Sequence, residues 1–340
     1  MKIFRVLIAI LFIWSLNACE RPAEQILRPE YAMAIHGGAG VIKAELMSPE
    51  QDSLYRASLL EALKAGEKIL ITGGSSLDAV TAAITILEDN PLFNAGRGAV
   101  FNANGFIEHD ASIMEGSDKN AGAVGAVRNI KNPILAARKV METSPHVFLV
   151  REGAEQFAAL QGLQIVDPSW FMVSRQREKY ENTKSSQLEK EFPLGEKHGT
   201  VGAVALDKAG NLAAGTSTGG MHFKHQGRLG DSPVIGAGTW ADNACCAVSA
   251  TGHGEYFIRY GVAQDIASRM IYGGQSLKEA ADEVVLQELV KLDAGGGIIA
   301  VDKDGNICMP FNTAGMFRAS VRAREEPFVG LFASDSLQLE

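Results

Sequence analysis

The sequence lacks the features that are typical of nucleic-acid-binding, membrane-spanning and disulfide-rich proteins. Its formal net charge is −8, and no stretch combines basic residues with interleaved aromatic ones, which argues against a nucleic-acid partner. The apolar run at residues 6–16 contains eleven residues, whereas a transmembrane helix needs about 20. Only four cysteines are present, and no spacing of cysteine and histidine resembles a zinc site. We therefore expect the chain to bind neither nucleic acid nor a structural zinc ion.

The remaining composition is that of an ordinary globular protein. Apolar residues make up 46% of the chain and charged residues 21%, which excludes disordered and fibrous proteins. A length of 340 residues allows one large domain or two smaller ones. The unusual feature is the content of 36 glycines, which are not periodic but gather in short motifs such as Gly37-Gly38 and Gly219-Gly220. Glycine in such motifs permits positive φ and lets the backbone approach a ligand closely.

The N-terminus is predicted to be a leader followed by a tether. Basic residues precede the apolar run at residues 6–16, and Leu16-Asn17-Ala18-Cys19 resembles a bacterial lipoprotein signal. We expect removal of residues 1–18, a lipid on Cys19 and a tether at residues 19–30. The protein would then lie in the bacterial cell envelope, periplasmic or exterior-facing, with the membrane as a partner only through this anchor. An ordinary secretory signal with an incidental cysteine is the alternative.

The three cysteines that follow the leader are Cys245, Cys246 and Cys308. An odd number of cysteines in an oxidising compartment argues against a disulfide framework. We expect them to be buried free thiols, because such thiols behave as small apolar side chains.

Apolar periodicity predicts helices and strands along the first half of the chain. A buried strand at residues 31–35 runs into the glycine-rich motif His36-Gly37-Gly38-Ala39-Gly40. Serines near residue 76 can cap one helix, and Pro133 stands at the start of another. Helices are predicted at residues 53–70, 76–87, 133–141 and 152–160, and strands at residues 122–127 and 146–150.

A polar segment separates this half from the next one. Residues 174–197 are rich in lysine, glutamate, glutamine, serine and asparagine and contain few apolar residues. Such a segment cannot bury enough apolar surface to offset the entropy lost on ordering. The sequence therefore predicts a flexible linker at about residues 174–197.

Beyond the linker, the sequence predicts two similar β-hairpins and two helices. The hairpins lie at residues 200–218 and 298–313, each around a turn of the form Asp-Lys-x-Gly-Asn. The helices are predicted at residues 255–270 and 276–292, and the second opens with a capping box. Strands interleaved with pairs of helices favour a layered α+β architecture.

The candidate nucleophile is Thr200, in the motif His198-Gly199-Thr200-Val201-Gly202. A threonine hydroxyl is a poor nucleophile because its own side chain contains no base. Cleavage of the bond between Gly199 and Thr200 would free an α-amine, which titrates at about 8 and can accept the hydroxyl proton when neutral. A disposable linker, a small residue before the threonine and the rigid start of a strand all suit such a cleavage. A threonine that merely opens a strand is the alternative.

Three neighbouring motifs can complete this chemistry. Thr218 ends the strand predicted to pair with that of Thr200, so its hydroxyl can hydrogen-bond the nucleophile. Thr251, with the backbone N–H groups around Gly252, can form an oxyanion hole. Arg228 and Asp231 can pair with the α-carboxylate and α-ammonium groups of an amino acid. For this last pair, a surface ion pair worth less than about 1 kcal/mol is the alternative.

Taken together, these motifs resemble the plant-type L-asparaginase/isoaspartyl aminopeptidase family. The resemblance covers roughly residues 31–325, with the motifs in the family's order. It is carried by Ala34-Ile35-His36-Gly37-Gly38-Ala39-Gly40, Asn90-Pro91-Leu92-Phe93-Asn94-Ala95-Gly96, His109-Asp110-Ala111-Ser112-Ile113-Met114, His198-Gly199-Thr200-Val201-Gly202-Ala203-Val204, Gly227-Arg228-Leu229-Gly230-Asp231-Ser232-Pro233 and Pro310-Phe311-Asn312-Thr313.

The resemblance implies a fold, an assembly and a reaction. The fold is the αββα sandwich of the N-terminal nucleophile hydrolases, and the precursor cleaves itself into an α subunit, here residues 31–199, and a β subunit, here residues 200–340. The two subunits stay together in an (αβ)₂ assembly. The implied reaction is hydrolysis of L-asparagine or of β-aspartyl dipeptides to aspartate, with no organic cofactor and no catalytic metal.

The resemblance also assigns roles to individual residues. Thr200 is the nucleophile, supported by the hydroxyl of Thr218, and the oxyanion hole consists of Thr251 and Gly252. Arg228 binds the substrate carboxylate, Asp231 and Gly254 position its amino group, and Asn94 lies near the nucleophile. A structural sodium ion is implied on the backbone carbonyls of one loop, at Leu87, Glu88, Asn90, Phe93, Ala95 and Arg97.

The sequence departs from the family at one notable place and leaves other functions open. His253 stands where the family has threonine, close to the implied oxyanion hole, and its titration could alter the pH dependence or the substrate preference. Phe223-Lys224 and the stretch before Thr218 resemble the related glycosylasparaginases, so a glycosylated asparagine is an alternative substrate. A lipid-anchored amino-acid-binding protein, in which Thr200 never becomes a terminus, is the alternative of a different class.

Overall fold

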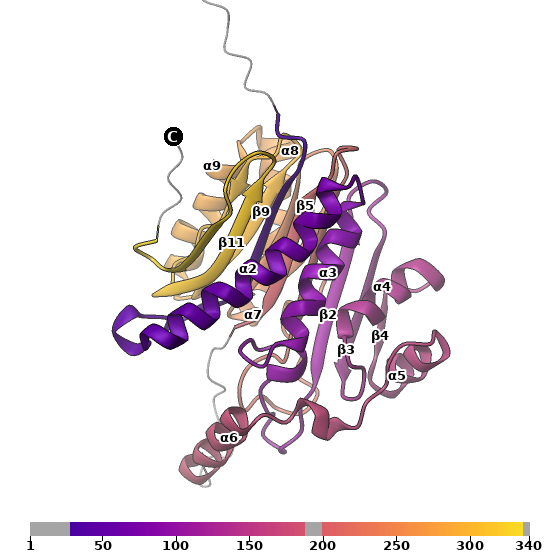
Figure 1. Ribbon diagram of the computed structural model, residues 1–340, viewed down its shortest axis with the longest axis vertical. Helices are drawn as coiled ribbons and strands as arrows, with labels where there is room; N and C mark the ends of the chain where they lie inside the picture. Colours follow the sequence, from indigo (N-terminus) through magenta and orange to yellow (C-terminus); the bar gives the residue numbers. More distant parts are fainter. Residues whose placement is uncertain (1–27, 188–198, 336–340) are drawn as a thin grey trace, which may run out of the picture.

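The structure is a computed structural model that describes residues 28–187 and 199–335 (Figure 1). The predicted signal peptide, the lipidation site Cys19 and the end of the predicted linker lie outside the described residues. In the part that is described, no helix is both long and apolar enough to cross a membrane.

The described part of the chain consists of two β-sheets and the helices that lie between their strands in the sequence. The larger sheet has eight strands, and all neighbouring pairs are antiparallel except the parallel pair β3 and β4. In spatial order its strands are β12 (Phe328–Phe332), β11 (Gly315–Arg322), β1 (Ala32–Gly40), β5 (Val201–Leu206), β6 (Leu212–Thr218), β2 (His109–Glu115), β3 (Ala121–Val127) and β4 (Phe148–Val150). The smaller, antiparallel sheet contains β10 (Ile307–Cys308), β9 (Gly296–Asp302), β8 (Cys246–Gly252) and β7 (Thr239–Ala241).

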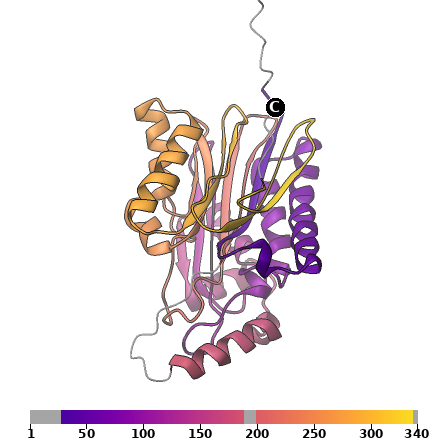
Figure 2. The ribbon, with the colours of Figure 1, turned by 90° about the vertical axis from the view of Figure 1, so that its left-hand side faces the viewer.

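The helices lie mainly outside the two sheets. Figure 2 shows α2 and α3 on one side of the strands and the helices that follow residue 253 on the other. The α-helices are α2 (Pro49–Ile71), α3 (Ser76–Asp89), α4 (Pro133–Thr143), α5 (Arg151–Leu160), α6 (Ser174–Gln187), α7 (Gly254–Tyr260), α8 (Val262–Gly273), α9 (Leu277–Asp282) and α10 (Leu289–Lys291). Short helical turns are η1 (Ala44–Leu46), η2 (Gly96–Gly98), η3 (Pro168–Phe171) and η4 (Glu283–Glu288), of which the last is a π-helix.

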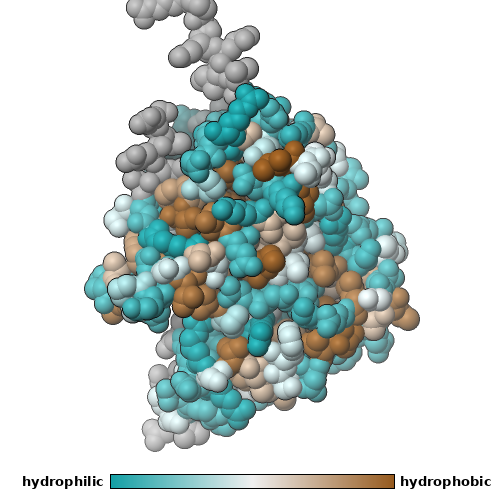
Figure 3. Space-filling model, in the orientation of Figure 1, coloured by the Kyte–Doolittle hydropathy of each residue, from teal (hydrophilic) through white to brown (hydrophobic). Residues whose placement is uncertain are grey.

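Buried apolar side chains form separate cores between these layers. One core joins the larger sheet to α2, α3 and α4, and another joins the smaller sheet to α8 and α9. Between the two sheets the core is rich in small side chains, among them Ala34, Ala214 and Ala247. Small side chains on facing sheets let their backbones approach closely. On the face of the molecule shown in Figure 3, hydrophobic residues form separate patches within a mostly hydrophilic surface.

Local sequence signals account for most helix starts. Ser276 accepts a hydrogen bond from the backbone N–H of Glu279, whose carboxylate in turn accepts from the N–H of Ser276, so the predicted capping box is present. Ser75 caps α3 and Pro133 opens α4, as predicted. The first hairpin also forms as predicted, because Asp207 accepts hydrogen bonds from the backbone of its own turn.

The predicted linker is wrong for its first part, because residues 174–187 form helix α6. Gln176, Tyr180 and Thr183 recur on one face of this helix and are buried. The Gln176 side chain donates a hydrogen bond of 2.8 Å to the carbonyl of Gly98. Two of these three buried side chains are neither aliphatic nor aromatic, so the helix has no apolar periodicity to read from the sequence. In Figures 1 and 2, α6 lies beyond one end of the sheets.

Two other elements differ from the prediction in their continuity. The single helix predicted at residues 255–270 is divided into α7 and α8 by Gly261, whose φ of 56° is left-handed. The second hairpin has a short return strand, since β10 covers only Ile307–Cys308 of the predicted residues 307–313. Cys245 and Cys246 are buried free thiols as predicted, whereas Cys308 is free but only partly buried.

Candidate active site

Thr200 lies directly before β5 and faces the end of β6. The register of the two strands pairs Val201 with Ser217, and its continuation brings Thr200 opposite Thr218. The Thr200 side chain is buried, and its hydroxyl donates a hydrogen bond of 3.1 Å to Oγ1 of Thr218. Oγ1 of Thr218 also accepts a 2.9 Å hydrogen bond from the N–H of Gly220. The structure thus places two of the predicted residues in direct contact.

Asn94 lies against the bond predicted to be cleaved. Its Nδ2 group donates hydrogen bonds of 2.7 Å to the carbonyl of Gly199 and to that of Gly220. Its Oδ1 atom accepts a 3.0 Å hydrogen bond from the N–H of Val100, which fixes the amide's orientation. A donor on the Gly199 carbonyl polarises that carbonyl and stabilises negative charge on its oxygen. Asn94 is therefore placed to assist attack at Gly199.

The glycine-rich motif after the first strand packs on the same bond. Gly38 has a φ of 111°, and a Cβ atom there would lie 2.3 Å from the Cα atom of Gly199. The β1–β11 pairing shifts register between His36 and Gly38, which is a β-bulge. Only glycine combines this φ with such a close approach of two backbones. The motif thus serves as a surface against which the cleavage site is held.

His36 is a site residue whose role the sequence did not reveal. Its Nδ1 atom lies 2.9 Å from the carbonyl oxygen of Thr200, and its Nε2 atom lies 3.0 Å from Oγ of Ser249. Because a carbonyl can only accept, Nδ1 carries the proton and Nε2 accepts from the serine hydroxyl. Burial lowers the pKa of His36 to about 3, so the imidazole is neutral. A neutral ring in one tautomer fixes the backbone at the nucleophile.

A chain of buried hydroxyls continues from His36 between the two sheets. Ser249 lies 2.7 Å from Oγ1 of Thr216, which lies 2.6 Å from Oγ1 of Thr239. Ser112 donates to Thr239 at 2.8 Å or to the carbonyl of Ser232 at 2.6 Å. This chain of hydroxyls therefore ends at Ser232, the residue after Asp231. It connects the backbone of the nucleophile with the predicted substrate-binding loop.

The predicted oxyanion-hole residues lie at the end of β8. Thr251 is buried, and its Oγ1 atom accepts a 3.3 Å hydrogen bond from the N–H of Ala39. This contact joins the end of β8 to the motif that packs on Gly199. Gly252 is closely packed as well, because a Cβ atom there would lie 2.7 Å from the carbonyl oxygen of Gly295. The structure brings both residues to the glycine-rich side of the site.

Arg228 pairs with a residue that the sequence analysis did not single out. Its Nε and Nη2 atoms donate hydrogen bonds of 3.0 and 2.9 Å to the two carboxylate oxygens of Glu255. Asp231 lies beside this pair, and Gly254 lies between Asp231 and Arg228. A Cβ atom on Gly254 would be 2.8 Å from Oδ1 of Asp231 and 3.0 Å from Nη2 of Arg228. The three predicted binding residues thus do converge, with Glu255 as a fourth member.

Asp231 is a buried carboxyl with an altered acidity. Burial raises the pKa of Asp231 to about 7, the negative charge of Glu255 acts in the same direction, and Arg228 opposes both. Among the described residues, its Oδ2 atom has no hydrogen-bond partner. A buried carboxylate oxygen of this kind suits a cationic ligand group. His253, the departure from the family pattern, lies near this cluster, with Nε2 3.6 Å from a carboxylate oxygen of Glu255.

A buried ion pair supports the other side of the nucleophile. The Nζ atom of Lys224 lies 3.7 Å from Oδ2 of Asp110, and both side chains are buried. Asp110 is the β2 residue that pairs with Thr218. Lys224 also approaches Gly220, where a Cβ atom would lie 2.9 Å from Nζ. The only sequence signal for this pair is that Asp110 and Lys224 both stand in motifs shared with the resembled families.

The predicted sodium loop closes tightly on two of its carbonyl groups. A Cβ atom on Gly96 would lie 2.3 Å from the carbonyl oxygen of Glu88, and one on Gly98 would lie 2.0 Å from that of Phe93. Only glycine fits at these two positions, and backbone carbonyl oxygens such as those of Glu88 and Phe93 are the ligand type that a hard cation takes. No cluster of three or more histidine, cysteine, aspartate or glutamate side chains that could hold a metal occurs in residues 28–187 and 199–335.

Comparison with known proteins identifies close relatives. The sequence matches the family described as asparaginase over residues 29–331. The isoaspartyl peptidases of Salmonella typhimurium and Escherichia coli are each 50% identical to this chain over 309 residues; both alignments cover 88% of this chain, and they cover 98% and 95% of those proteins. The isoaspartyl peptidase/L-asparaginase of Mus musculus is 43% identical over 310 residues, which are 90% of this chain and 94% of that protein.

The predicted location in the cell envelope is wrong. Relatives from bacteria and from a mammal align with this chain over 94–98% of their own lengths. The unaligned remainder of those proteins is too short for a leader and tether like the predicted residues 1–30. The match to the family itself starts at residue 29. Anchoring through a lipid on Cys19, and with it the membrane as a partner, finds no support in these relatives.

Proposed function

Since this chain belongs to the asparaginase family, we propose that it hydrolyses the side-chain amide of L-asparagine and the β-aspartyl bond of isoaspartyl dipeptides, and releases aspartate. The observation that carries the proposal is the contact between the hydroxyls of Thr200 and Thr218, next to a Gly199 carbonyl that accepts from Asn94. The relatives' names favour these substrates over a glycosylated asparagine. Enzymes of this family need no cofactor.

The first step is cleavage of the chain by its own threonine. The hydroxyl oxygen of Thr200 bonds to the carbonyl carbon of Gly199, the bond from that carbon to the Thr200 nitrogen breaks, and the hydroxyl proton passes to the nitrogen. Asn94 donates to the oxygen that becomes negative during this attack. Water then hydrolyses the ester, which leaves a carboxylate on Gly199 and a free α-amine on Thr200.

The freed amine supplies the base that the hydroxyl lacks. When neutral, it takes the proton of the Thr200 hydroxyl as the oxygen attacks the side-chain carbonyl of the substrate. Ammonia or an amino acid leaves with that proton, and water hydrolyses the β-aspartyl ester to free aspartate. Thr218 accepts a hydrogen bond from the Thr200 hydroxyl and so holds its oxygen in position. Thr251 and Gly252 stabilise the negative oxygen of the intermediate.

The charged cluster on the other side of the site selects the aspartyl group. Arg228 pairs with the α-carboxylate of the substrate, and Asp231 with its α-ammonium group, because the two residues bear the complementary charges. Gly254 lets Asp231 and Arg228 lie close together, because a Cβ atom at this position would collide with both side chains. In the absence of substrate, Glu255 accepts from Nε and Nη2 of Arg228, so the substrate carboxylate must compete with Glu255 for these donors.

The domain arrangement and assembly of the family are part of the proposal. Two sheets that share a core, with helices on their outer faces, support a four-layer αββα sandwich of the N-terminal nucleophile hydrolase type. We infer an α subunit that ends at Gly199 and a β subunit that begins at Thr200, paired as (αβ)₂. The backbone carbonyl groups of Leu87, Glu88, Asn90, Phe93, Ala95 and Arg97 would hold a structural sodium ion, whose role is to fix the loop that carries Asn94.

One experiment tests the self-cleavage and the activity together. Purified protein is run on a denaturing gel, the smaller fragment is sequenced, and the release of ammonia from L-asparagine is measured. The expected fragment begins at Thr200, and Thr200→Ala gives an uncut, inactive chain. Hydrolysis by a chain that remains intact between residues 199 and 200 would refute the mechanism. An uncut chain that binds asparagine without hydrolysing it would support the binding protein instead.

A further inference from the structure

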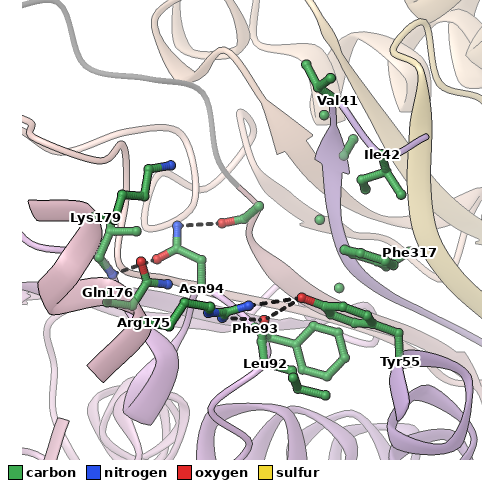
Figure 4. A pocket seen from close by; sticks show the side chains of 16 residues that line it. Val41, Ile42, Tyr55, Leu92, Phe93, Asn94, Arg175, Gln176, Lys179 and Phe317 are labelled. Carbon is green, nitrogen blue, oxygen red and sulfur yellow. Dashed lines mark hydrogen bonds between the residues drawn. The ribbon is translucent and has the colours of Figure 1, made fainter. Parts of the chain in front are cut away.

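A cavity of about 360 Å³ adjoins the cleavage site and has no assigned role (Figure 4). Among the described residues, its lining includes Gly199 and Asn94 but none of Arg228, Asp231 and Gly254. The cavity therefore meets the reacting bond without being part of the cluster proposed to bind the aspartyl group. Its wall is formed by the glycine-rich motif, α2, the loop before η2, α6 and β11.

One wall of this cavity is aromatic. The rings of Tyr55 and Phe317 are stacked, with centroids 4.2 Å apart and planes inclined by 11°. Phe93 meets Tyr55 edge-on at 5.8 Å. Three aromatic side chains that fix one another present a rigid apolar surface at low entropic cost. Such a surface suits an apolar side chain of a bound molecule.

The edge of this aromatic wall is cationic, because Arg175 lies next to Tyr55 (Figure 4). Arg175, on α6, donates hydrogen bonds to the hydroxyl of Tyr55 at 3.1 Å and to the carbonyls of Pro91 and Leu92 at 3.0 and 3.1 Å. These acceptors are all neutral, and no carboxylate of the described residues forms an ion pair with Arg175. The guanidinium is thus fixed in orientation while its charge is not neutralised. Gln176 anchors the helix beside it through the carbonyl of Gly98.

We propose that this cavity is the leaving-group subsite for β-aspartyl dipeptides, with the aromatic wall against an apolar side chain and Arg175 paired with the free α-carboxylate of the released residue. The inference rests on the proposed hydrolysis. An isoaspartyl dipeptide differs from asparagine in carrying, beyond the reacting amide, a side chain and a carboxylate. The cavity offers one complementary surface for each. Gly199, whose carbonyl carbon is the predicted site of cleavage, lines the cavity and directly precedes the nucleophile in sequence.

The test compares three substrates in the cleaved enzyme: L-asparagine, β-Asp-Leu and β-Asp-leucinamide, which lacks the terminal carboxylate. In the native enzyme, kcat/KM is expected to be about 10-fold higher for β-Asp-Leu than for its amide, a modest factor because Arg175 is exposed to water. Arg175→Gln is expected to lower kcat/KM for β-Asp-Leu by a similar factor and to leave L-asparagine and the amide unchanged. Arg177→Gln, on the same helix but outside the cavity, is the matched control and should change none of the three.

The outcomes separate this inference from the proposed function. If the native enzyme hydrolyses L-asparagine but does not distinguish the dipeptide from its amide, the subsite is refuted and the activity stands. Equal losses for all three substrates in Arg175→Gln would mean a structural role and would also refute the subsite. An equal rise in kcat/KM for all three substrates in Arg175→Gln would mean that Arg175 binds the new C-terminal carboxylate of Gly199, and it would refute the subsite as well. Absence of any hydrolysis by the native, cleaved enzyme would refute the proposed function itself.

Discussion

Replacement of Asn94 by alanine is expected to slow self-cleavage strongly. In the structure, Nδ2 of Asn94 lies 2.7 Å from the carbonyl oxygen that becomes negative when Thr200 attacks. Removal of one such donor from a buried site costs roughly 10²- to 10³-fold in rate, or about 3 to 4 kcal/mol. A water molecule that enters the space left by the side chain can restore part of this stabilisation. We therefore expect Asn94→Ala to lower the rate of self-cleavage by about 10²-fold. Asn94→Asp places an acceptor against the carbonyl and should be slower still.

The assay follows the conversion of freshly purified precursor into two fragments on a denaturing gel. Asn94 also donates to Gly220 and accepts from Val100, so its loss is expected to cost about 1 to 3 kcal/mol of stability as well, which thermal unfolding measures separately. Asn104→Ala is the control, because Asn104 is exposed and its side-chain amide donates to the side chain of Gln226 instead of to Gly199. Cleavage of Asn94→Ala within a few-fold of the native rate would refute the role of Asn94 at the Gly199 carbonyl.

Three further substitutions test other parts of the site. Thr218→Val keeps the shape but removes the hydroxyl beside the nucleophile, and kcat for L-asparagine is expected to fall by about 10- to 100-fold with little change in KM. Asp231 must be ionised to bind an ammonium group, so the fall of kcat/KM that protonation of the Thr200 amine causes below about pH 8 should become steeper below about pH 7, where Asp231 is protonated as well. Glu255→Gln removes a charge that raises the pKa of Asp231 and should move this second step to lower pH; an unmoved or upward-moved step would contradict the assignment. Gly38→Ala should lower the stability by at least about 2 kcal/mol and delay self-cleavage, whereas Gly40→Ala, whose added Cβ meets no atom within 4 Å, should change neither in thermal unfolding and gel assays.

The parts of the molecule that were predictable from the sequence are those specified by nearby residues. The hairpin before Thr218 follows from alternating apolar residues around a turn in which Asp207 accepts hydrogen bonds from its own backbone. That hairpin alone is enough to place Thr218 opposite Thr200. Helix starts were predictable for the same reason, because a capping residue lies within three positions of the groups that it satisfies.

The parts that were not predictable depend on residues that are distant in sequence or that break the usual patterns. Glu255 meets Arg228 across 27 positions, and no local pattern pairs them. His36 reaches Ser249 across 213 positions, so its tautomer follows only from the three-dimensional structure. Helix α6 escaped the periodicity argument because its buried face includes Gln176 and Thr183. Its contribution to the cavity through Arg175 was hidden for the same reason.

The order of strands in the larger sheet has a consequence for the product of self-cleavage. β1 precedes the cut, yet it lies between β11 and β5, which both follow it; β6, which also follows the cut, pairs with β2, which precedes it. The two pieces are therefore interwoven through shared backbone ladders instead of meeting at a flat boundary. Pulling them apart would expose unpaired strand edges and strip the core that both line, so scission of the peptide is expected to leave a heterodimer that unfolds in one cooperative transition and does not dissociate on dilution.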